Sequence, residues 1–207
     1  MNESSCDGSY NDPMVSAVVL AAGASTRMGR PKLLLPLGGE PLVRRTVRQV
    51  MDAGFDDVLV VVGFDAYAVL TALDGLGCRH AVNTKYQSGM GSSFRTAIEA
   101  LGDGDAAMFA LADQPFVTAR EYAQLLDAYQ KQLSGIVSVR YGDVTAPPHL
   151  FDRRFFEELS VLEHGARPVL QRHRDVTTVL QFPPELLLDV DTPEDYQRAI
   201  ERIASGR

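Results

Sequence analysis

Short, continuous apolar runs alternate with amphipathic stretches along this chain of 207 residues. Residues 15–22 and 57–63 are rich in valine and leucine and are bounded by glycine, and residues 106–112 form a third run. Runs of this length without polar alternation are typical of strands that are buried on both faces. The stretches between them repeat apolar residues at helical spacing. This order predicts a single three-layer α/β/α domain, in which helices cover both faces of a mostly parallel sheet.

Nothing in the sequence predicts a membrane partner or a secretory signal. The apolar runs are shorter than the roughly 18 residues that a membrane-spanning helix needs. Residues 1–13 are polar and lack the basic-then-apolar order of a signal peptide, so we expect a disordered leader before a domain over residues 14–207. The two cysteines, Cys6 and Cys78, are too few for a disulfide framework and suit a cytoplasmic protein.

Charge is unevenly distributed along the chain. The formal net charge of −7 argues against nucleic acid as a partner. Residues 14–51 nevertheless carry six cations and one acid, Glu40. An acidic protein with one basic segment is typical of a small anionic ligand held locally. For Arg44, Arg45 and Arg48 the alternative is a solvated helix face.

The loop after the first apolar run has the composition of an anion site. In open α/β sheets, ligands bind outside the carboxyl ends of the strands. Residues 23–32 begin with glycine and other small residues, which let backbone N–H groups approach an anion, and Arg27 and Lys32 add positive charge. The loop is not a Walker A motif, because Lys32 lies three residues beyond Gly29. It also lacks the three spaced glycines of a dinucleotide site.

Two further loops suggest a nucleotide and a metal. Residues 83–94 (NTKYQSGMGSSF) lead into a predicted helix over residues 94–101. Their serines either cap that helix or contact a base or ribose. Asp113, at the end of the third apolar run, either holds a metal bound to phosphates or starts the turn that Pro115 completes.

An acidic stretch precedes the last predicted helix. Asp189 and Asp191 are two residues apart, and in a strand both would point to the same side and so to one ion. The sequence does not distinguish which of the two completes a metal site. Asp195 is expected to face the start of its own helix.

Residues 20–32 (LAAGASTRMGRPK) resemble the signature of the nucleotidyltransferases that attach a nucleotide to molybdopterin. The continuation over residues 32–36 (KLLLP) is similar to the branch of molybdenum cofactor cytidylyltransferases. Residues 21–23 read Ala-Ala-Gly, as in that cytidine-using branch, whereas guanosine-using relatives carry Ala-Gly-Gly. The resemblance therefore indicates CTP, and its extent is roughly residues 15–203.

Three later segments resemble the same family. They are Gly-Met-Gly-Ser-Ser at residues 89–93, Ala-Asp-Gln-Pro at residues 112–115, and Asp-x-Asp-Thr-Pro-Glu-Asp at residues 189–195. The resemblance implies a Rossmann-like nucleotidyltransferase fold of the nucleotide-diphospho-sugar transferase type. Residues 14–115 would form the nucleotide-binding half and residues 116–207 the acceptor-binding half.

The resemblance also implies site residues and Mg²⁺ as cofactor. Arg27, Lys32 and Asp113 would be catalytic, and Asp113 would hold the ion together with Asp189 or Asp191. The residues implied to bind the nucleotide are Leu20, Ala21, Ala22, Gly23, Ser25, Arg27, Lys32, Asn83, Gly89, Gly91, Ser92 and Ser93.

Two segments depart from the family pattern. Where the family usually has Gly-x-Pro-x-Leu-Phe, residues 146–151 read APPHLF, and residues 162–167 (LEHGAR) keep only the second half of Gly-Asp-x-Gly-Ala-Arg. Both lie in the half expected to hold the acceptor. Gln114, His149 and Arg167 are our candidate acceptor ligands, with contact to an acceptor phosphate as one role. The alternatives are a packing role for His149 and a solvated helix face for Arg167.

The implied reaction is attack by a phosphate oxygen of molybdopterin on the α-phosphorus of CTP, with release of pyrophosphate. A phosphate monoester has a second pKa of ~6 and is already ionised at neutral pH, so no general base is needed. Such a transfer needs alignment and charge neutralisation instead.

The sequence is also compatible with three different functions. In the first, GTP replaces CTP, and in the second, the acceptor is a sugar or polyol phosphate. The third is a non-catalytic accessory protein that binds molybdenum cofactor and passes it to a molybdenum hydroxylase such as xanthine dehydrogenase, which would then be a partner. A carrier has no need of a triphosphate site, so Arg27, Lys32 and Asp113 favour the enzyme.

Overall fold

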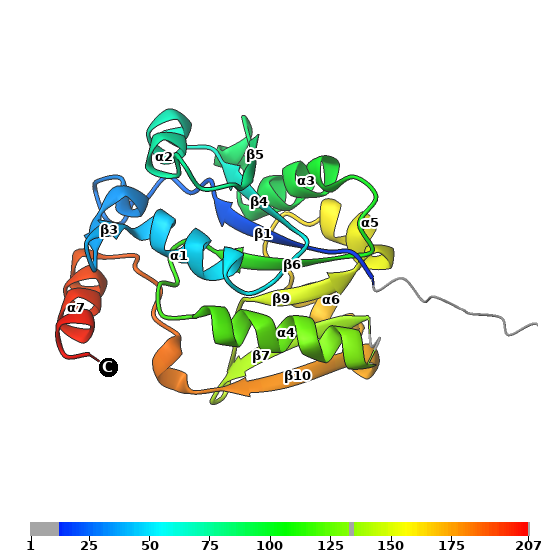
Figure 1. The fold of residues 1–207 in the computed structure, drawn as a ribbon. Helices are drawn as coiled ribbons and strands as arrows, with labels where there is room; N and C mark the ends of the chain where they lie inside the picture. Colours follow the sequence, from blue (N-terminus) through cyan, green and yellow to red (C-terminus); the bar gives the residue numbers. More distant parts are fainter. Residues whose placement is uncertain (1–12, 133–134, 207) are drawn as a thin grey trace, which may run out of the picture.

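The computed structural model describes residues 13–132 and 135–206, and a mixed β-sheet lies at its centre (Figure 1). The strands lie side by side in the order β5, β4, β1, β6, β9, β7 and β10, while β8 pairs with β7. The three predicted strands are confirmed as β1, β4 and β6, each to within one residue. The bounds are β1 (Val15–Ala21), β4 (Asp57–Val62), β5 (Arg79–Val82), β6 (Ala106–Leu111), β7 (Ile136–Tyr141), β8 (Val144–Thr145), β9 (His149–Asp152) and β10 (Thr177–Phe182).

Most neighbouring strands are parallel, as predicted. β6, β1, β4 and β5 run in one direction and β10 is parallel to β7, whereas β9 is antiparallel to both β6 and β7. The carboxyl ends of the parallel strands therefore meet at one edge of the sheet. Because β9 runs the other way, its first residue, His149, pairs with Phe109 near the end of β6. The loops after the parallel strands and the start of β9 converge on the same edge.

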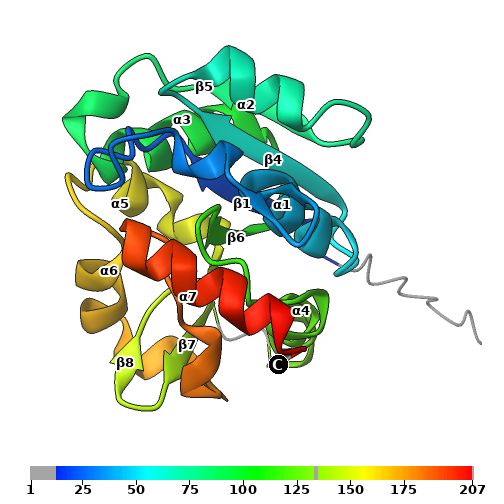
Figure 2. The same cartoon turned by 90° about the vertical axis from the view of Figure 1, so that its left-hand side faces the viewer.

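Helices cover both faces of the sheet, which confirms the predicted three layers (Figures 1 and 2). Along β1, Ala17 and Val19 belong to one hydrophobic core and Val18 and Leu20 to the other. The first core contains residues of α1, α2 and α4, and the second contains residues of α3, α5 and α6. The bounds are α1 (Leu42–Met51), α2 (Ala66–Ala72), α3 (Met90–Leu101), α4 (Ala119–Gln132), α5 (Phe156–Ser160) and α6 (Arg167–Arg172).

The last helix, α7 (Pro193–Ala204), lies at the edge where the parallel strands end (Figure 2). It packs on a short hairpin formed by β2 (Pro36–Leu37) and β3 (Glu40–Pro41). The Tyr196 hydroxyl donates to the Pro36 carbonyl at 2.5 Å and ties the helix to this hairpin. None of the helices in the described ranges is long and apolar enough to span a membrane.

Two elements differ from the sequence-based expectation. α3 begins at Met90 and not at residue 94, and its N-cap, Gly89, makes no side-chain capping bond. Residues 187–191 form no strand, although the expectation that Asp189 and Asp191 point to the same side required one. The predicted leader, residues 1–13, lies outside the described residues except for Pro13.

Candidate functional site

Two adjoining cavities lie at the carboxyl edge of the sheet. The first, of about 290 Å³, is lined by the loop after β1, and we call it the loop cavity. The second, of about 1020 Å³, lies over β7, β8, β9 and α6, and we call it the wide cavity. Leu20, Met90 and Leu111 line both. The two cavities therefore share a wall, which suits two ligands that meet there.

The loop after β1 is shaped by Ser25 and Met28. Ser25 has a φ of 53°, in the left-handed region that a non-glycine residue rarely adopts. The Met28 backbone N–H donates to the Ser25 carbonyl at 3.1 Å, and the Met28 side chain is buried in the core. The Ser25 hydroxyl in turn accepts from the Lys32 backbone N–H at 3.3 Å. These contacts fold residues 23–32 around the loop cavity.

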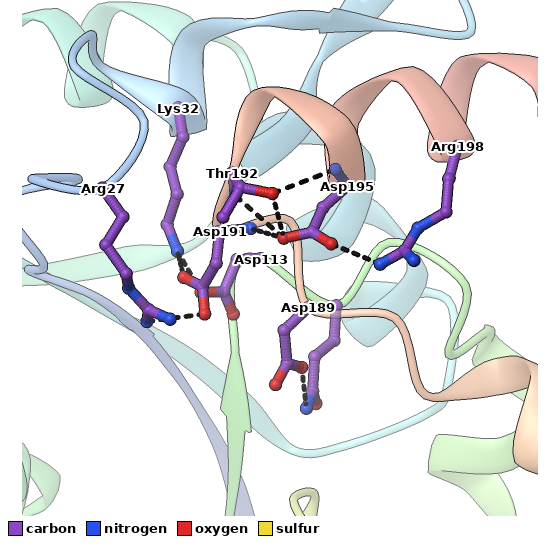
Figure 3. Close-up of polar contacts among 9 residues, drawn as sticks. Arg27, Lys32, Asp113, Asp189, Asp191, Thr192, Asp195 and Arg198 are labelled. Atoms are coloured by element: carbon purple, nitrogen blue, oxygen red, sulfur yellow. Dashed lines mark hydrogen bonds and ion pairs between the residues drawn. The ribbon is translucent and has the colours of Figure 1, made fainter.

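Lys32 lies at the centre of a charged cluster in this cavity (Figure 3). Its Nζ lies 2.5 Å from Asp113 Oδ2 and 2.6 Å from Asp191 Oδ1, and Arg27 Nη2 lies 2.7 Å from Asp191 Oδ2. Burial of the ammonium would lower the pKa of Lys32, but the two carboxylates outweigh this and raise it. Lys32 is therefore fully charged at neutral pH.

Two contacts bring the carboxylates of the cluster together. The Thr46 hydroxyl of α1 donates to the Ala112 carbonyl at 3.0 Å and fixes the chain just before Asp113. The Val190 backbone N–H donates to the Asp113 carbonyl at 3.0 Å. That bond holds the acidic stretch beside the end of β6, so that Asp191 reaches Lys32.

Asp195 faces the start of α7, as predicted. Its Oδ2 accepts from the backbone N–H groups of Thr192 at 2.9 Å and Asp191 at 3.2 Å, and it forms a capping box with Thr192. Burial would raise the pKa of Asp195, but the hydrogen bonds from Thr192 outweigh it and hold the pKa below its usual value. Asp195 thus positions Asp191 and does not reach the cluster itself.

Asp113 retains one oxygen that suits a divalent cation. Asp113 Oδ1 is buried and has no hydrogen-bond partner within the described residues. A carboxylate oxygen with no donor is a ligand that hard cations prefer. In the described part of the chain no three acidic, histidine or cysteine side chains group to hold a metal. Two carboxylates fit Mg²⁺, because that ion usually binds one or two carboxylates together with substrate phosphates and waters.

Asp189 and Gln114 do not lie where the sequence placed them. Gln114 Nε2 donates to Asp189 Oδ1 at 2.8 Å, and Asp189 points away from Asp113 and Asp191 (Figure 3). The prediction that Asp189 and Asp191 point to the same side is wrong, because residues 187–191 form no strand. Gln114 is buried and lines neither cavity, so its candidate role as an acceptor ligand is not supported.

Most of the residues implied to bind a nucleotide line the loop cavity. Those that do are Leu20, Ala21, Ala22, Gly23, Ser25, Arg27, Lys32, Gly89 and Ser93. Thr26, Leu33, Tyr86, Met90 and Leu111 also line it and were not predicted. Tyr86 and Met90 belong to the candidate nucleotide segment over residues 83–94. The aromatic and apolar side chains of that segment could therefore have been predicted to line the site.

Asn83, Gly91 and Ser92 lie behind the cavity wall and do not line it. Asn83 Nδ2 donates to the hydroxyls of Ser92 at 2.8 Å and Ser93 at 3.1 Å, and Asn83 Oδ1 accepts from the Lys85 backbone N–H at 2.8 Å. Asn83 therefore holds the segment before α3 against the first turn of that helix. Direct contact of these three residues with a nucleotide stays a prediction, and their contacts here are with the chain before α3 and with α3 itself.

Gly91 allows close packing of α3 on the chain after α5. A Cβ at Gly91 would lie 1.8 Å from the Leu162 carbonyl oxygen. We expect Gly91→Ala to lower the free energy of unfolding by about 1–3 kcal/mol or more, because the neighbouring backbone must move. Urea unfolding measures the change. Gly77→Ala is the control, since a Cβ there meets only Met51 Cε at 3.9 Å; equal stability of the two variants would contradict the packing.

His149 and Arg167 both line the wide cavity. Arg167 is exposed at the start of α6, with no hydrogen bond or ion pair to any described residue, so its guanidinium is available to an anion. His149 is buried, and burial lowers its pKa to about 3. Its ring is therefore neutral at pH 7. A neutral, buried imidazole is no cationic ligand for an acceptor phosphate, so that suggested role does not fit His149.

The sequence matches the MobA-like NTP transferase domain over residues 17–176. It is 34% identical over 164 residues to a protein named nicotine blue oxidoreductase from Paenarthrobacter nicotinovorans, and the match covers 79% of this chain and 78% of that protein.

Solved structures agree with this family. Rv0371c from Mycobacterium tuberculosis H37Rv is 29% identical with a TM-score of 0.80, over 92% of this chain and 99% of that chain. Rv0371c has also been solved as a complex with manganese. A nucleotidyl transferase from Methanothermobacter thermautotroptrophicus is 25% identical with a TM-score of 0.81, over 94% and 99% of the two chains. This chain therefore belongs to the MobA-like NTP transferase family and has a nucleotidyltransferase fold.

Proposed function

We propose that this protein transfers CMP from CTP to the phosphate of molybdopterin or molybdenum cofactor and releases pyrophosphate. One observation carries the proposal: the loop cavity, with its cluster of Lys32, Asp113 and Asp191, shares a wall with a much larger cavity. A compact charged site beside a wide, partly apolar one suits a nucleoside triphosphate that reacts with a bulkier acceptor.

The loop cavity would hold the triphosphate. Gly23, Arg27 and Lys32 line this space, so backbone N–H groups of the loop and two cationic side chains would bind the phosphates. The Arg27 side chain is 69% exposed, so it can turn toward the β- and γ-phosphates at little cost. Lys32 Nζ, already between two carboxylates, would exchange one of them for a phosphate oxygen. Both cations then stabilise the departing pyrophosphate.

Asp113 and Asp191 are the residues that would hold Mg²⁺. When bound, the ion would neutralise phosphate charge and help to orient the triphosphate. Asp113 Oδ1, buried without a donor among the described residues, supports this assignment. Asp189 is bonded to Gln114 and points elsewhere, so we assign the second ligand to Asp191.

The wide cavity would hold the acceptor. Phe94, Phe109 and Leu111 give it an apolar wall, and Arg167 and Arg174 supply positive charge. In the reaction, an ionised phosphate oxygen of the acceptor bonds to the α-phosphorus of CTP. The bond from that phosphorus to the bridging β-oxygen breaks, and pyrophosphate leaves with the electron pair. No protein base takes part, because the attacking oxygen is already ionised.

A relative named for a redox reaction supports a second candidate function. Since the chain is 34% identical to a nicotine blue oxidoreductase, it could reduce a heteroaromatic ring in the wide cavity with a nucleotide reductant such as NADH or NADPH. Against this candidate, residues 23–32 lack the three spaced glycines of a dinucleotide site. The experiment must also distinguish GTP as the nucleotide, a sugar or polyol phosphate as the acceptor, and a non-catalytic cofactor carrier.

Pyrophosphate release separates these functions. We expect release from CTP with Mg²⁺ only when molybdopterin is present, and about tenfold slower release from GTP, because Ala22 lines the cavity at the position where guanosine-using relatives carry glycine. Sugar and polyol phosphates test the acceptor, and absorbance at the reduced-nicotinamide band tests NADH and NADPH. Faster release from GTP would reassign the nucleotide. Reductant consumption without pyrophosphate release would replace the proposed function by the second candidate.

A further inference from the structure

Ser138 and His149 form a buried hydrogen-bonded pair in the wall of the wide cavity. Ser138 lies on β7 and His149 is the first residue of β9, and the two are 2% and 6% exposed. Ser138 Oγ lies 3.1 Å from His149 Nδ1. Both residues line the cavity, and the proposed reaction uses neither of them.

The pair bears on which imidazole nitrogen carries the proton. Ser138 Oγ has no other hydrogen-bond partner within residues 13–132 and 135–206, so we assign its hydroxyl proton to the bond with His149 Nδ1. A neutral imidazole that accepts at Nδ1 carries its proton on Nε2. Burial lowers the pKa of His149 to about 3, which keeps the ring neutral at pH 7. His149 therefore presents a neutral N–H group at Nε2.

Nε2 is the atom through which His149 meets the cavity. Nε2 has no hydrogen-bond partner in the described part of the chain, and it is not completely buried. It must therefore retain access to the space that the ring lines. Around it, Phe94 and Phe109 make that wall apolar, and the Phe151 ring lies edge-on to the imidazole at 6.3 Å. An N–H group in such surroundings needs a partner from a ligand.

We infer that His149 Nε2–H recognises a ring carbonyl of a flat heterocyclic ligand in the wide cavity, with Ser138 holding the required tautomer. This inference rests on the proposed function in taking the wide cavity as the acceptor site. A single neutral donor between aromatic rings suits a carbonyl oxygen, which accepts one such bond. It does not suit a phosphate, which would lose its hydration against apolar walls without gaining a counter-charge. Arg167, exposed elsewhere in the same cavity, is the group suited to a phosphate.

The assignment concerns specificity and not proton transfer. With a pKa of about 3, His149 takes no proton at neutral pH and cannot serve as a base. The Ser138–His149 pair would thus distinguish which ring the wide cavity accepts.

Two small probes test the inference without CTP or turnover. Pterin carries a ring carbonyl where 2,4-diaminopteridine carries an amino group, and both can be followed by fluorescence titration. We expect the wild-type protein to bind pterin about tenfold more tightly, which is the effect of one hydrogen bond in an apolar site. His149→Phe keeps a ring of similar size without the N–H, and we expect it to lose that preference through weaker pterin binding alone.

Two further variants and an NMR spectrum test the N–H donor and the tautomer of His149 separately. His149→Gln retains an N–H donor and is expected to restore part of the preference, whereas Ser138→Ala frees the tautomer and is expected to weaken pterin binding about two- to threefold. In the wild-type protein, ¹⁵N spectra should show the proton of His149 on Nε2 and a shift of that nitrogen when pterin binds.

The outcomes separate this inference from the proposed reaction. Equal affinity of the wild-type protein for both probes, no binding of either, or a proton on Nδ1 would overturn the inference. A retained carbonyl preference without pyrophosphate release from CTP would overturn the proposed reaction and leave the His149 assignment standing. Turnover without any probe preference would do the opposite.

Discussion

Lys32→Met is expected to reduce kcat for nucleotidyl transfer by ~10²–10³-fold, equivalent to about 3–4 kcal/mol, which is the usual effect of losing one group that stabilises transition-state charge. Methionine keeps an unbranched side chain as far as Cε but removes the ammonium that bridges Asp113 and Asp191. The departing pyrophosphate then loses its most buried cation. Single-turnover measurement of pyrophosphate release with CTP, Mg²⁺ and acceptor gives the effect on the chemical step.

The same variant should change metal binding in the opposite direction. In the described structure Lys32 Nζ contacts one oxygen of each carboxylate, and a divalent cation would need those oxygens. Without the ammonium, Mn²⁺ used as a probe should bind more tightly, while turnover falls. Lys131→Met is a matched control, because Lys131 lies on α4 with a side chain that is 71% exposed and pairs only locally with Asp127. Wild-type turnover in Lys32→Met would remove Lys32 from the site.

The strands that position the site were readable from the sequence because each is buried on both faces. All seven residues of β1 are buried, so its apolar run carries no competing pattern. The loop after β1 then follows from the rule that ligands bind at the carboxyl ends of parallel strands. Nine of the twelve residues implied for the nucleotide line the loop cavity for this reason.

The position of β9 in the sheet could not be predicted from the sequence. His149–Asp152 is only four residues long, and nothing in those residues indicates that the strand enters antiparallel between β6 and β7. That pairing is set by contacts with strands far away in the sequence. Because of this pairing, His149 lies in the wall of the wide cavity and not in a loop. Sequence reasoning named the residue and left a phosphate contact and a packing role open, because burial and the Ser138 contact were not visible.

Long-range contacts explain the remaining errors. Lys32 meets Asp113 and Asp191 across 81 and 159 residues of sequence, and spacing alone gives no information about such a meeting. The acidic stretch was treated as a strand, yet its conformation is set by the capping box of α7 and by the bond from Val190 to Asp113. Local alternation therefore gave the wrong partner for Asp189.

Three asparagine substitutions test which carboxylates serve the proposed metal site. Asp113→Asn keeps the shape of the side chain but removes the charge of the residue whose Oδ1 is buried without a donor in the described residues. We expect it to reduce kcat by ~10²–10³-fold and to abolish Mn²⁺ binding in the presence of CTP. Asp191→Asn should weaken both properties in the same direction, because Asp191 shares Lys32 with Asp113.

Asp189→Asn provides the discriminating comparison. Asp189 accepts from Gln114 Nε2 and points away from the cluster, so an asparagine oxygen can keep that hydrogen bond. Since no charge of the cluster is lost, we expect turnover within about threefold of wild type, in line with the loss of one peripheral charge. All three variants should unfold cooperatively on heating, which would show that the differences arise at the site. If Asp189→Asn lost metal binding and turnover while Asp191→Asn retained both, the second ligand would be Asp189, and the chain over residues 187–191 would have to rearrange when nucleotide binds.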